Sequence, residues 1–199
     1  YELWINNLII DNNELYNQIV KVLRSKVGDE FLFFDWNEYF DYKYKIIQIE
    51  KRHLILNFIE KIEKIKENIF LTLYQAIPNK IDKIEDIIEK WTQIWYSKFV
   101  FFNSRRSQDL FLSENKIQRF KNIIKESTEL SQRNKNPEII FEKKLDLKNI
   151  SWENYYFHTE NQESNYLKNI DFSKTNYNLF VWPEWWFDDI EVKEFDINN

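Results

Sequence analysis

Ile69-Phe-Leu-Thr-Leu-Tyr-Gln-Ala76 is a short apolar run, and the residues that follow it decide the fold. Residues 80–94 have helical periodicity, and a second apolar run, Lys98-Phe-Val-Phe-Phe102, comes next. Two short runs rich in aromatic and branched residues, separated by a helix of this length, are typical of a β-α-β unit with parallel strands. The sequence therefore predicts a parallel α/β sheet that begins near residue 69.

The same alternation continues toward the C-terminus. Residues 114–132 have the period of a helix, and another helix is predicted from Asp188. Three more strands are predicted at residues 138–141, 155–158 and 178–181. Strands that alternate with helices in this way predict an α/β C-terminal domain over residues 67–199.

The N-terminal third has a different pattern. Glu38–Ile49 and Arg52–Ile59 alternate apolar and polar side chains, which is the period of half-buried strands, and residues 30–34 form another strand-like run. One helix is predicted over residues 13–23. We expect its apolar side to consist of Leu15, Ile19, Val22 and Leu23. These elements predict a small β-barrel over residues 1–66, followed by a charged linker at Lys61–Glu67.

Composition excludes several classes of protein. The chain has no Cys, which excludes disulfides, thiolate catalysis and Cys-based zinc sites. No cluster of His, Asp and Glu has the spacing of a metal site, so no metal is predicted. No apolar run approaches the roughly 20 residues of a membrane span, and no signal peptide is visible, so we expect a cytoplasmic protein without a membrane partner.

Charge is distributed unevenly along the chain. The formal net charge is −5, yet residues 69–149 hold 15 Lys and Arg against 11 Asp and Glu. The last fifty residues hold 3 against 10. The basic excess therefore lies in the middle of the chain, where a surface that faces phosphate is expected, although a Lys-rich helix face is often only solvated.

The chain has one Gly and eight Trp in 199 residues, although average Gly usage is about 7%. Gly is the usual residue wherever the backbone needs a positive φ. Val181-Trp182-Pro183-Glu184-Trp185-Trp186-Phe187 follows a predicted strand. With Gly at its three Trp positions, this segment becomes a loop that a ligand can approach closely.

That loop, with its glycines, resembles the cofactor loop of the RsmE family, the 16S ribosomal RNA (uracil-N3)-methyltransferases of the SPOUT superfamily. The resemblance extends over residues 8–197 through ordered blocks. These blocks are Ile19–Asp29, Gln75–Pro78, Ile87–Lys90, Asn103–Ser107 and Ser131–Ile139. It implies a PUA-like RNA-binding barrel, followed by a SPOUT domain with a trefoil knot that works as a homodimer. It also implies transfer of a methyl group from S-adenosyl-L-methionine (SAM) to N3 of a uridine in 16S rRNA of the small ribosomal subunit.

The family places glycines, or residues that tolerate exchange for glycine, at six of the Trp positions: 36, 91, 95, 182, 185 and 186. Gly at 36 would give an Asp-Gly hairpin turn, and Gly at 95 would end the helix that contains residue 91. Our hypothesis is that UGA codons for Gly were translated as Trp, and the alternative is a genuinely Trp-rich protein. The chain starts with Tyr1 and contains no Met, and the family's knot-threading segment has no counterpart before Asn199. We therefore expect truncation at both ends.

The resemblance also implies site residues. The cofactor would be held by Trp182, Pro183, Glu184, Trp185 and Trp186, although the same segment could be an ordinary Pro-containing turn before a helix. His158-Thr-Glu160 resembles the family's His-Pro-Glu, with Thr in place of Pro, which puts His158 near the cofactor site without a catalytic role.

Five further positions would contact RNA. Ser104, Arg106 and Ser107 match the family's Ser-x-Arg-Ser, and Arg106 is the candidate catalytic residue because it would hold a phosphate or the flipped uridine. The alternative for Arg106 is a solvated loop arginine. Arg133 matches the arginine of Gln-Ser-x-Arg, with Leu130 at the Gln position. Arg24 is either a phosphate contact of the barrel or part of a surface salt bridge.

Two other functions remain open at the level of sequence. A non-catalytic RNA-binding protein would use the barrel and the basic middle, and three literal indoles in the loop would favour it. Another SPOUT enzyme, such as a ribose 2′-O-methyltransferase, is opposed by the N-terminal barrel and by the Asn103–Ser107 block.

Overall fold

The structure is a computed structural model. It describes residues 7–34, 39–64, 66–104, 112–147, 150, 153–156 and 173–181. The chain divides into two compact units, residues 1–66 and 67–199.

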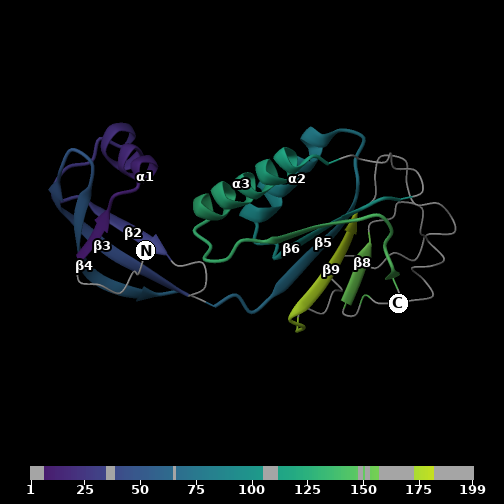
Figure 1. The fold of residues 1–199 in the computed structure, drawn as a ribbon. Helices are drawn as coiled ribbons and strands as arrows, with labels where there is room; N and C mark the ends of the chain where they lie inside the picture. The colour runs from purple at the N-terminus through teal and green to yellow at the C-terminus, as the bar shows by residue number, and fades with distance from the viewer. Residues whose placement is uncertain are drawn as a thin grey trace. The chain divides into compact units, whose positions relative to one another are not determined.

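The first unit is a four-stranded antiparallel sheet with one helical segment (Figure 1). Its strands are β1 (Asn7–Ile10), β2 (Glu30–Phe34), β3 (Phe40–Ile49) and β4 (Leu54–Glu63). They lie in the order β1-β4-β3-β2, so β1 and β2 are the edges of the described sheet. The predicted strands are confirmed, but β4 includes Lys61–Glu63, which the sequence placed in a linker.

The helical segment begins as α1 (Asn13–Asn17) and continues as a π-helical turn, η1 (Gln18–Val22). Ile19 is buried, as expected, but Val22 and Leu23 are 73% and 58% exposed, so their predicted packing is wrong. A π-helical turn holds more residues than an α-helical turn, so it rotates the following side chains away from the face that a 3.6-residue period predicts.

The turn before β2 uses the single glycine of the chain. Gly28 has φ +103°, its N–H donates to the Ile46 carbonyl (2.8 Å), and the Ile46 N–H donates to the Asp29 carbonyl (2.9 Å). The β2–β3 pair that follows is antiparallel, with Phe34 opposite Asp41, as the hairpin pattern predicts. Trp36 lies in the connection, outside the described residues.

The second unit is a five-stranded parallel sheet with helices on one face (Figure 1). The strands are β5 (Phe70–Ala76), β6 (Lys98–Phe102), β7 (Glu138–Glu142), β8 (Glu153–Tyr156) and β9 (Asn176–Val181). Their order is β7-β6-β5-β9-β8, and each neighbouring pair is parallel. The helices are α2 (Ile81–Gln93) and α3 (Glu114–Leu130). The predicted parallel α/β sheet is confirmed.

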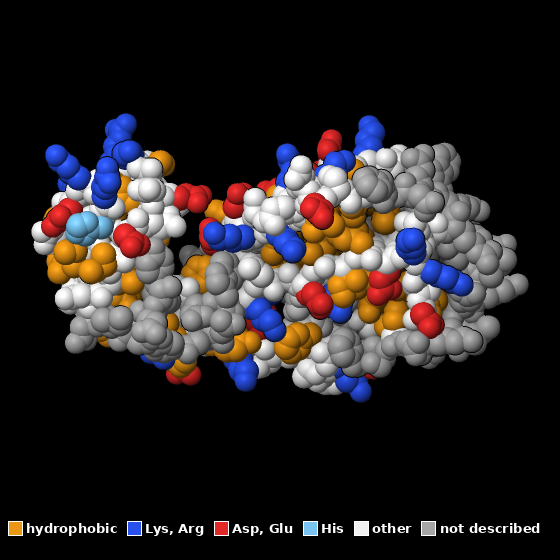
Figure 2. All heavy atoms as spheres, in the orientation of Figure 1, with side chains coloured by type: hydrophobic (Ala, Val, Ile, Leu, Met, Phe, Trp, Pro, Cys, Tyr) orange, Lys and Arg blue, Asp and Glu red, His pale blue; other side chains and the backbone are white. Residues whose placement is uncertain are grey.

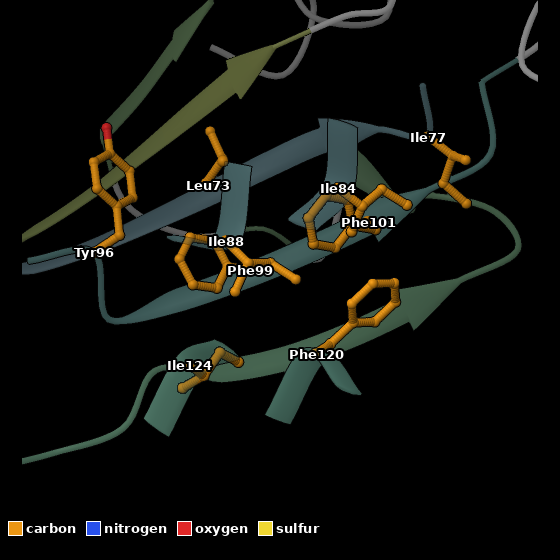
Figure 3. Packing of buried hydrophobic residues seen from close by; sticks show 9 residues of the cluster. All are labelled: Leu73, Ile77, Ile84, Ile88, Tyr96, Phe99, Phe101, Phe120 and Ile124. Atoms are coloured by element: carbon orange, nitrogen blue, oxygen red, sulfur yellow. The ribbon is translucent and has the colours of Figure 1, made fainter. Parts of the chain in front are cut away.

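The core of this unit lies between the sheet and the two helices (Figure 3). Alternate strand residues face the helices, and the buried members of this core are Leu73, Ile77, Ile84, Ile88, Tyr96, Phe99, Phe101, Phe120 and Ile124. The intervening residues face the other side, where the rings of Tyr74 and Phe180 stack at 4.6 Å. Side chains of period two thus bury both faces of the central strands.

Both helices end in the same backbone motif. Trp95, with φ +74°, follows α2, and its N–H donates to the Thr92 carbonyl (3.0 Å), while the Tyr96 N–H donates to the Trp91 carbonyl (3.1 Å). Gln132, with φ +56°, follows α3 in the same way. These are Schellman motifs, whose left-handed residue is usually glycine. Trp95 therefore occupies a position that favours Gly, as the sequence predicted.

Candidate functional site

The strand order of the second unit has one topological switch point. From β5 the chain proceeds outward through β6 to β7, whereas β9 and β8 lie on the opposite side of β5. The direction of winding therefore reverses between β5 and β9. In open α/β sheets, ligands bind beyond the carboxyl ends of the strands at such a point. Here these ends are Gln75 and Val181, which are register partners.

Backbone hydrogen bonds hold the segments that leave this edge. The Ile77 N–H, just after β5, donates to the Phe102 carbonyl at the end of β6 (2.9 Å). The Asn103 N–H donates to the Glu142 carbonyl at the end of β7 (3.2 Å). The carboxyl ends of three neighbouring strands are therefore fixed relative to one another.

A buried polar side chain lies at this switch point. Gln75 is 6% exposed, and its Nε2 donates to the Ala76 carbonyl (3.0 Å). On the other face of the same strand, Tyr74 stacks on Phe180. Burial raises the pKa of the Tyr74 hydroxyl, and the nearby Glu142 carboxylate raises it further. A neutral amide and a neutral phenol therefore lie on opposite faces of β5 near its carboxyl end, and both are hydrogen-bonding groups.

The sequence-predicted site residues follow β6, β8 and β9, three of the five parallel strands. Trp182–Trp186 come directly after β9, His158 comes two residues after β8, and Arg106 and Ser107 come soon after β6. All of these lie outside the described residues. Ser104, two residues after Phe102, is described and is half-buried. Because the strands are parallel, the described ends of β6, β8 and β9, after which these residues come in the chain, lie at one edge of the sheet.

Arg133 lies elsewhere. Its guanidinium is 1% exposed and pairs with Glu67 through two bonds, Nε–Oε1 at 3.1 Å and Nη2–Oε2 at 3.0 Å. Its Nη1 donates to the carbonyls of Thr92 (3.2 Å) and Tyr96 (2.7 Å) at the end of α2. Since the donors on all three of its nitrogens are engaged inside the protein, this geometry does not support the predicted RNA contact at Arg133.

Arg24 belongs to the first unit and is exposed at the end of η1, with φ +54°. Its proposed phosphate contact stays a prediction. Among the described residues, no group of three or more His, Asp or Glu side chains is arranged to hold a metal ion. The sequence did not assign a role to Gln75 or Tyr74. The sequence feature that could have identified them is a polar side chain at the end of an apolar strand.

Comparison with known protein families decides the identity of the chain. Residues 65–198 match the RNA methyltransferase domain family, and residues 10–59 match the RNA methyltransferase PUA domain family. The chain is a member of the RNA methyltransferase domain family. Its methyltransferase domain coincides with the unit that contains the switch point, and its PUA domain lies in the antiparallel unit. No curated protein matches the chain significantly in sequence.

Solved structures share the fold of this RNA methyltransferase at low sequence identity. A proposed methyltransferase from Legionella pneumophila, in complex with SAM, has a TM-score of 0.75 and 19% identity, covering 97% of this chain and 81% of its own. Ribosomal RNA small subunit methyltransferase E from Neisseria gonorrhoeae, bound to SAM, has a TM-score of 0.74 and 16% identity, covering 96% and 80%. An RNA methyltransferase predicted in Thermotoga maritima has a TM-score of 0.66 and 20% identity, covering 97% and 84%.

The surface of the methyltransferase domain has mixed charge. Figure 2 shows Lys and Arg side chains intermixed with Asp and Glu over the helices on the visible face, without one large basic patch. The basic excess of residues 69–149 is therefore not gathered on this face. In the part of the chain that the structure describes, no helix is both long and apolar enough to cross a lipid bilayer.

Proposed function

We propose that this RNA methyltransferase transfers the methyl group of SAM to N3 of a uridine in 16S rRNA. The observation that carries the proposal is the switch point between β5 and β9, from which the predicted cofactor loop departs directly after Val181. Membership of the RNA methyltransferase domain family and the two SAM-bound structures of the same fold support it.

SAM supplies an electrophilic methyl group, and the protein has to bring the uridine N3 into line with it. Residues 182–186 would hold SAM, with His158 nearby, and Ser104, Arg106 and Ser107 would hold the RNA. Arg24 of the PUA domain would contact a phosphate. Uridine N3–H is acidic enough that positioning and desolvation can supply most of the rate without a strong base. The buried amide of Gln75 and the neutral hydroxyl of Tyr74 fit an edge that binds a polar ligand.

The same proposal includes a working homodimer with a trefoil-knotted domain in the cytoplasm. It also includes glycine at the six Trp positions, for which the positive φ of Trp95 is the supporting observation. The gene should then have UGA, not UGG, at positions 36, 91, 95, 182, 185 and 186. UGG at most of them would end that part of the proposal.

A ribose 2′-O-methyltransferase and a non-catalytic RNA-binding protein are the alternatives, and one experiment separates all three. The variant with Trp182→Gly, Trp185→Gly and Trp186→Gly, which we expect to bind SAM, is incubated with unmodified small ribosomal subunits and SAM that carries a labelled methyl group. Methylation at N3 blocks Watson–Crick pairing, so reverse transcription should stop at one uridine. A 2′-O-methyl group leaves the pairing edge free, but it protects the adjacent phosphodiester from alkali. RNA binding without incorporation of label would favour the non-catalytic alternative.

A further inference from the structure

A hollow lies at the amino edge of the parallel sheet, opposite the edge that contains the switch point. It has a volume of about 500 Å³ and is formed where β5, β6, β7 and β9 begin. Its lining consists of Glu67, Phe70, Thr72, Ser97, Lys98, Arg133, Lys135, Asn136, Glu138 and Asn176. We name it the amino-edge pocket. β5 is seven residues long, so the two edges are about 20 Å apart.

An exposed aromatic ring forms part of the amino-edge pocket. Phe70, the first residue of β5, is 39% exposed, although a Phe at the end of a central strand would normally be covered. Its backbone is fixed, because the Phe70 N–H donates to the Thr175 carbonyl (2.7 Å). An exposed ring on a rigid strand is a platform on which a nucleobase can stack.

The cations of the amino-edge pocket differ in availability. Arg133 is committed to Glu67. Lys98 pairs with Glu138 at 3.1 Å, but the two side chains are 33% and 61% exposed, and such solvated pairs exchange partners at little cost. Lys135 is exposed and forms no ion pair within the described ranges. Two lysines can therefore turn toward a phosphate.

Uncharged polar groups complete the lining. The Ser97 hydroxyl oxygen is buried and has no hydrogen-bond partner among the described residues. The amides of Asn136 and Asn176 lie in the same lining. A buried hydroxyl without a partner costs free energy, which a polar ligand can recover, and amides are suited to the donor and acceptor edges of a base.

We propose that the amino-edge pocket is a second RNA site that takes one unpaired nucleotide, remote from methyl transfer. The base stacks on Phe70, the phosphate lies against Lys135 and Lys98, and the polar lining contacts the base edge or the 2′-hydroxyl. A volume of about 500 Å³ is in the range of small-ligand sites and accommodates a nucleotide. The inference rests on the proposed function only in taking RNA as the ligand.

The test is binding of a fluorescein-labelled, single-stranded 12-nucleotide RNA, measured by anisotropy over a range of salt concentrations. Phe70→Leu keeps an apolar side chain but removes the stacking face, and we expect about tenfold weaker binding. Lys135→Ala should weaken binding several-fold and lower the slope of log affinity against log salt by about 0.7, the value for one phosphate of a single strand. A 4-thiouridine version of the RNA should crosslink to the peptide that contains Phe70.

Two matched variants serve as controls. Lys121→Ala removes an exposed charge from α3, outside the pocket, and Ile69→Ala removes an exposed apolar side chain next to Phe70. Neither should change the salt slope or the crosslink. Equal losses from Lys121→Ala and Lys135→Ala, unchanged binding by Phe70→Leu, or no RNA binding by the parent chain would overturn the proposal. RNA binding at this pocket without methyl transfer, in the variant with Trp182→Gly, Trp185→Gly and Trp186→Gly, would instead contradict the proposed function alone.

Discussion

Arg133 and Glu67 form a buried ion pair with two parallel hydrogen bonds, at 3.1 and 3.0 Å, and their side chains are 1% and 9% exposed. The pair joins the first residue of the methyltransferase unit to the residue that follows the left-handed end of α3. Since Nη1 of Arg133 also caps two carbonyls at the end of α2, one guanidinium connects the chain entering the sheet with the ends of both helices.

Removing one partner of this pair should destabilise the domain strongly. Arg133→Ala leaves the buried Glu67 carboxylate without its cation and removes a donor from the carbonyls of Thr92 and Tyr96. We therefore expect a loss of about 3–5 kcal/mol in the free energy of unfolding, measured with urea. Arg119→Ala is the matched control, because its pair with Glu85 is at 2.7 Å but Arg119 is 67% exposed, so its removal should have a much smaller effect. Similar losses for the two variants would show that burial does not set the strength of the Arg133 pair.

Glycine at position 95 should stabilise the chain relative to alanine. Trp95 has φ +74°, and a Cβ in that conformation costs about 1 kcal/mol that glycine avoids. Trp95→Gly and Trp95→Ala both remove the ring and its contact with the Arg133 guanidinium at 5.6 Å, so their difference isolates the backbone. Thermal and urea unfolding should place the Gly variant about 1 kcal/mol above the Ala variant.

At position 91, the glycine variant should instead be less stable than the alanine variant. Trp91 lies inside α2, is half-buried, and its ring meets that of Tyr96 edge to face at 4.6 Å. Within a helix, glycine is about 1 kcal/mol worse than alanine, so Trp91→Gly should be the less stable of that pair. Equal Gly-minus-Ala differences at 91 and 95 would contradict the assignment of a left-handed backbone at 95.

Tyr96 should make stability depend on pH in the alkaline range. Burial raises the pKa of its hydroxyl to about 12. From about pH 10, the ordinary value, the unfolded chain loses this proton while the folded chain keeps it, so folding stability falls up to about pH 12. Tyr96→Phe should show a shallower decline in urea experiments between these limits. Burial also raises the pKa values of Tyr44 and Tyr74. Both residues are present in the two proteins, so their contributions to the pH dependence cancel in the comparison. Parallel declines would contradict the prediction.

Much of the fold could be predicted, because period and burial agree along most of the chain. Leu73, Phe99 and Phe101 alternate with residues of the other face, so a parallel sheet under helices follows from local pattern and element order. Val22 and Leu23 could not be placed, since a π-helical turn changes the angle between residues without a sequence signal that we recognise.

The site was only partly predictable, for a different reason. The carboxyl ends of β6, β8 and β9 lie at one edge because the strands are parallel, and this follows from the alternation of strands and helices in the sequence. No comparable rule predicts the position of Arg133 from the sequence. An arginine after a helix is usually solvated, and its burial depends on Glu67, which is 66 residues away in sequence. Only the tertiary structure brings that carboxylate to it.

SAM binding should depend on the side chains at positions 182, 185 and 186. Each Trp adds a large side chain where the predicted loop needs close approach or a positive φ, and overpacking or strain costs on the order of 1–3 kcal/mol per site. Isothermal titration calorimetry should detect little or no binding by the chain as printed. It should detect clear binding by the variant with Trp182→Gly, Trp185→Gly and Trp186→Gly. Micromolar binding by the printed chain would contradict the cofactor-loop hypothesis.

Arg106 should matter more to methyl transfer than to SAM binding. It comes four residues in sequence after β6 ends at Phe102, at the carboxyl edge where we propose that the RNA meets the cofactor. A guanidinium that grips a phosphate or a base edge is worth roughly 1.5–3 kcal/mol, so Arg106→Ala, made in the three-glycine variant, should slow methylation about ten- to a hundredfold. Its affinity for SAM should stay nearly unchanged. Arg105→Ala is the matched control, because it removes the neighbouring charge without touching the Ser-x-Arg-Ser pattern of residues 104–107. Equal loss of activity in the two variants would mean that positive charge in general, not Arg106 in particular, holds the RNA.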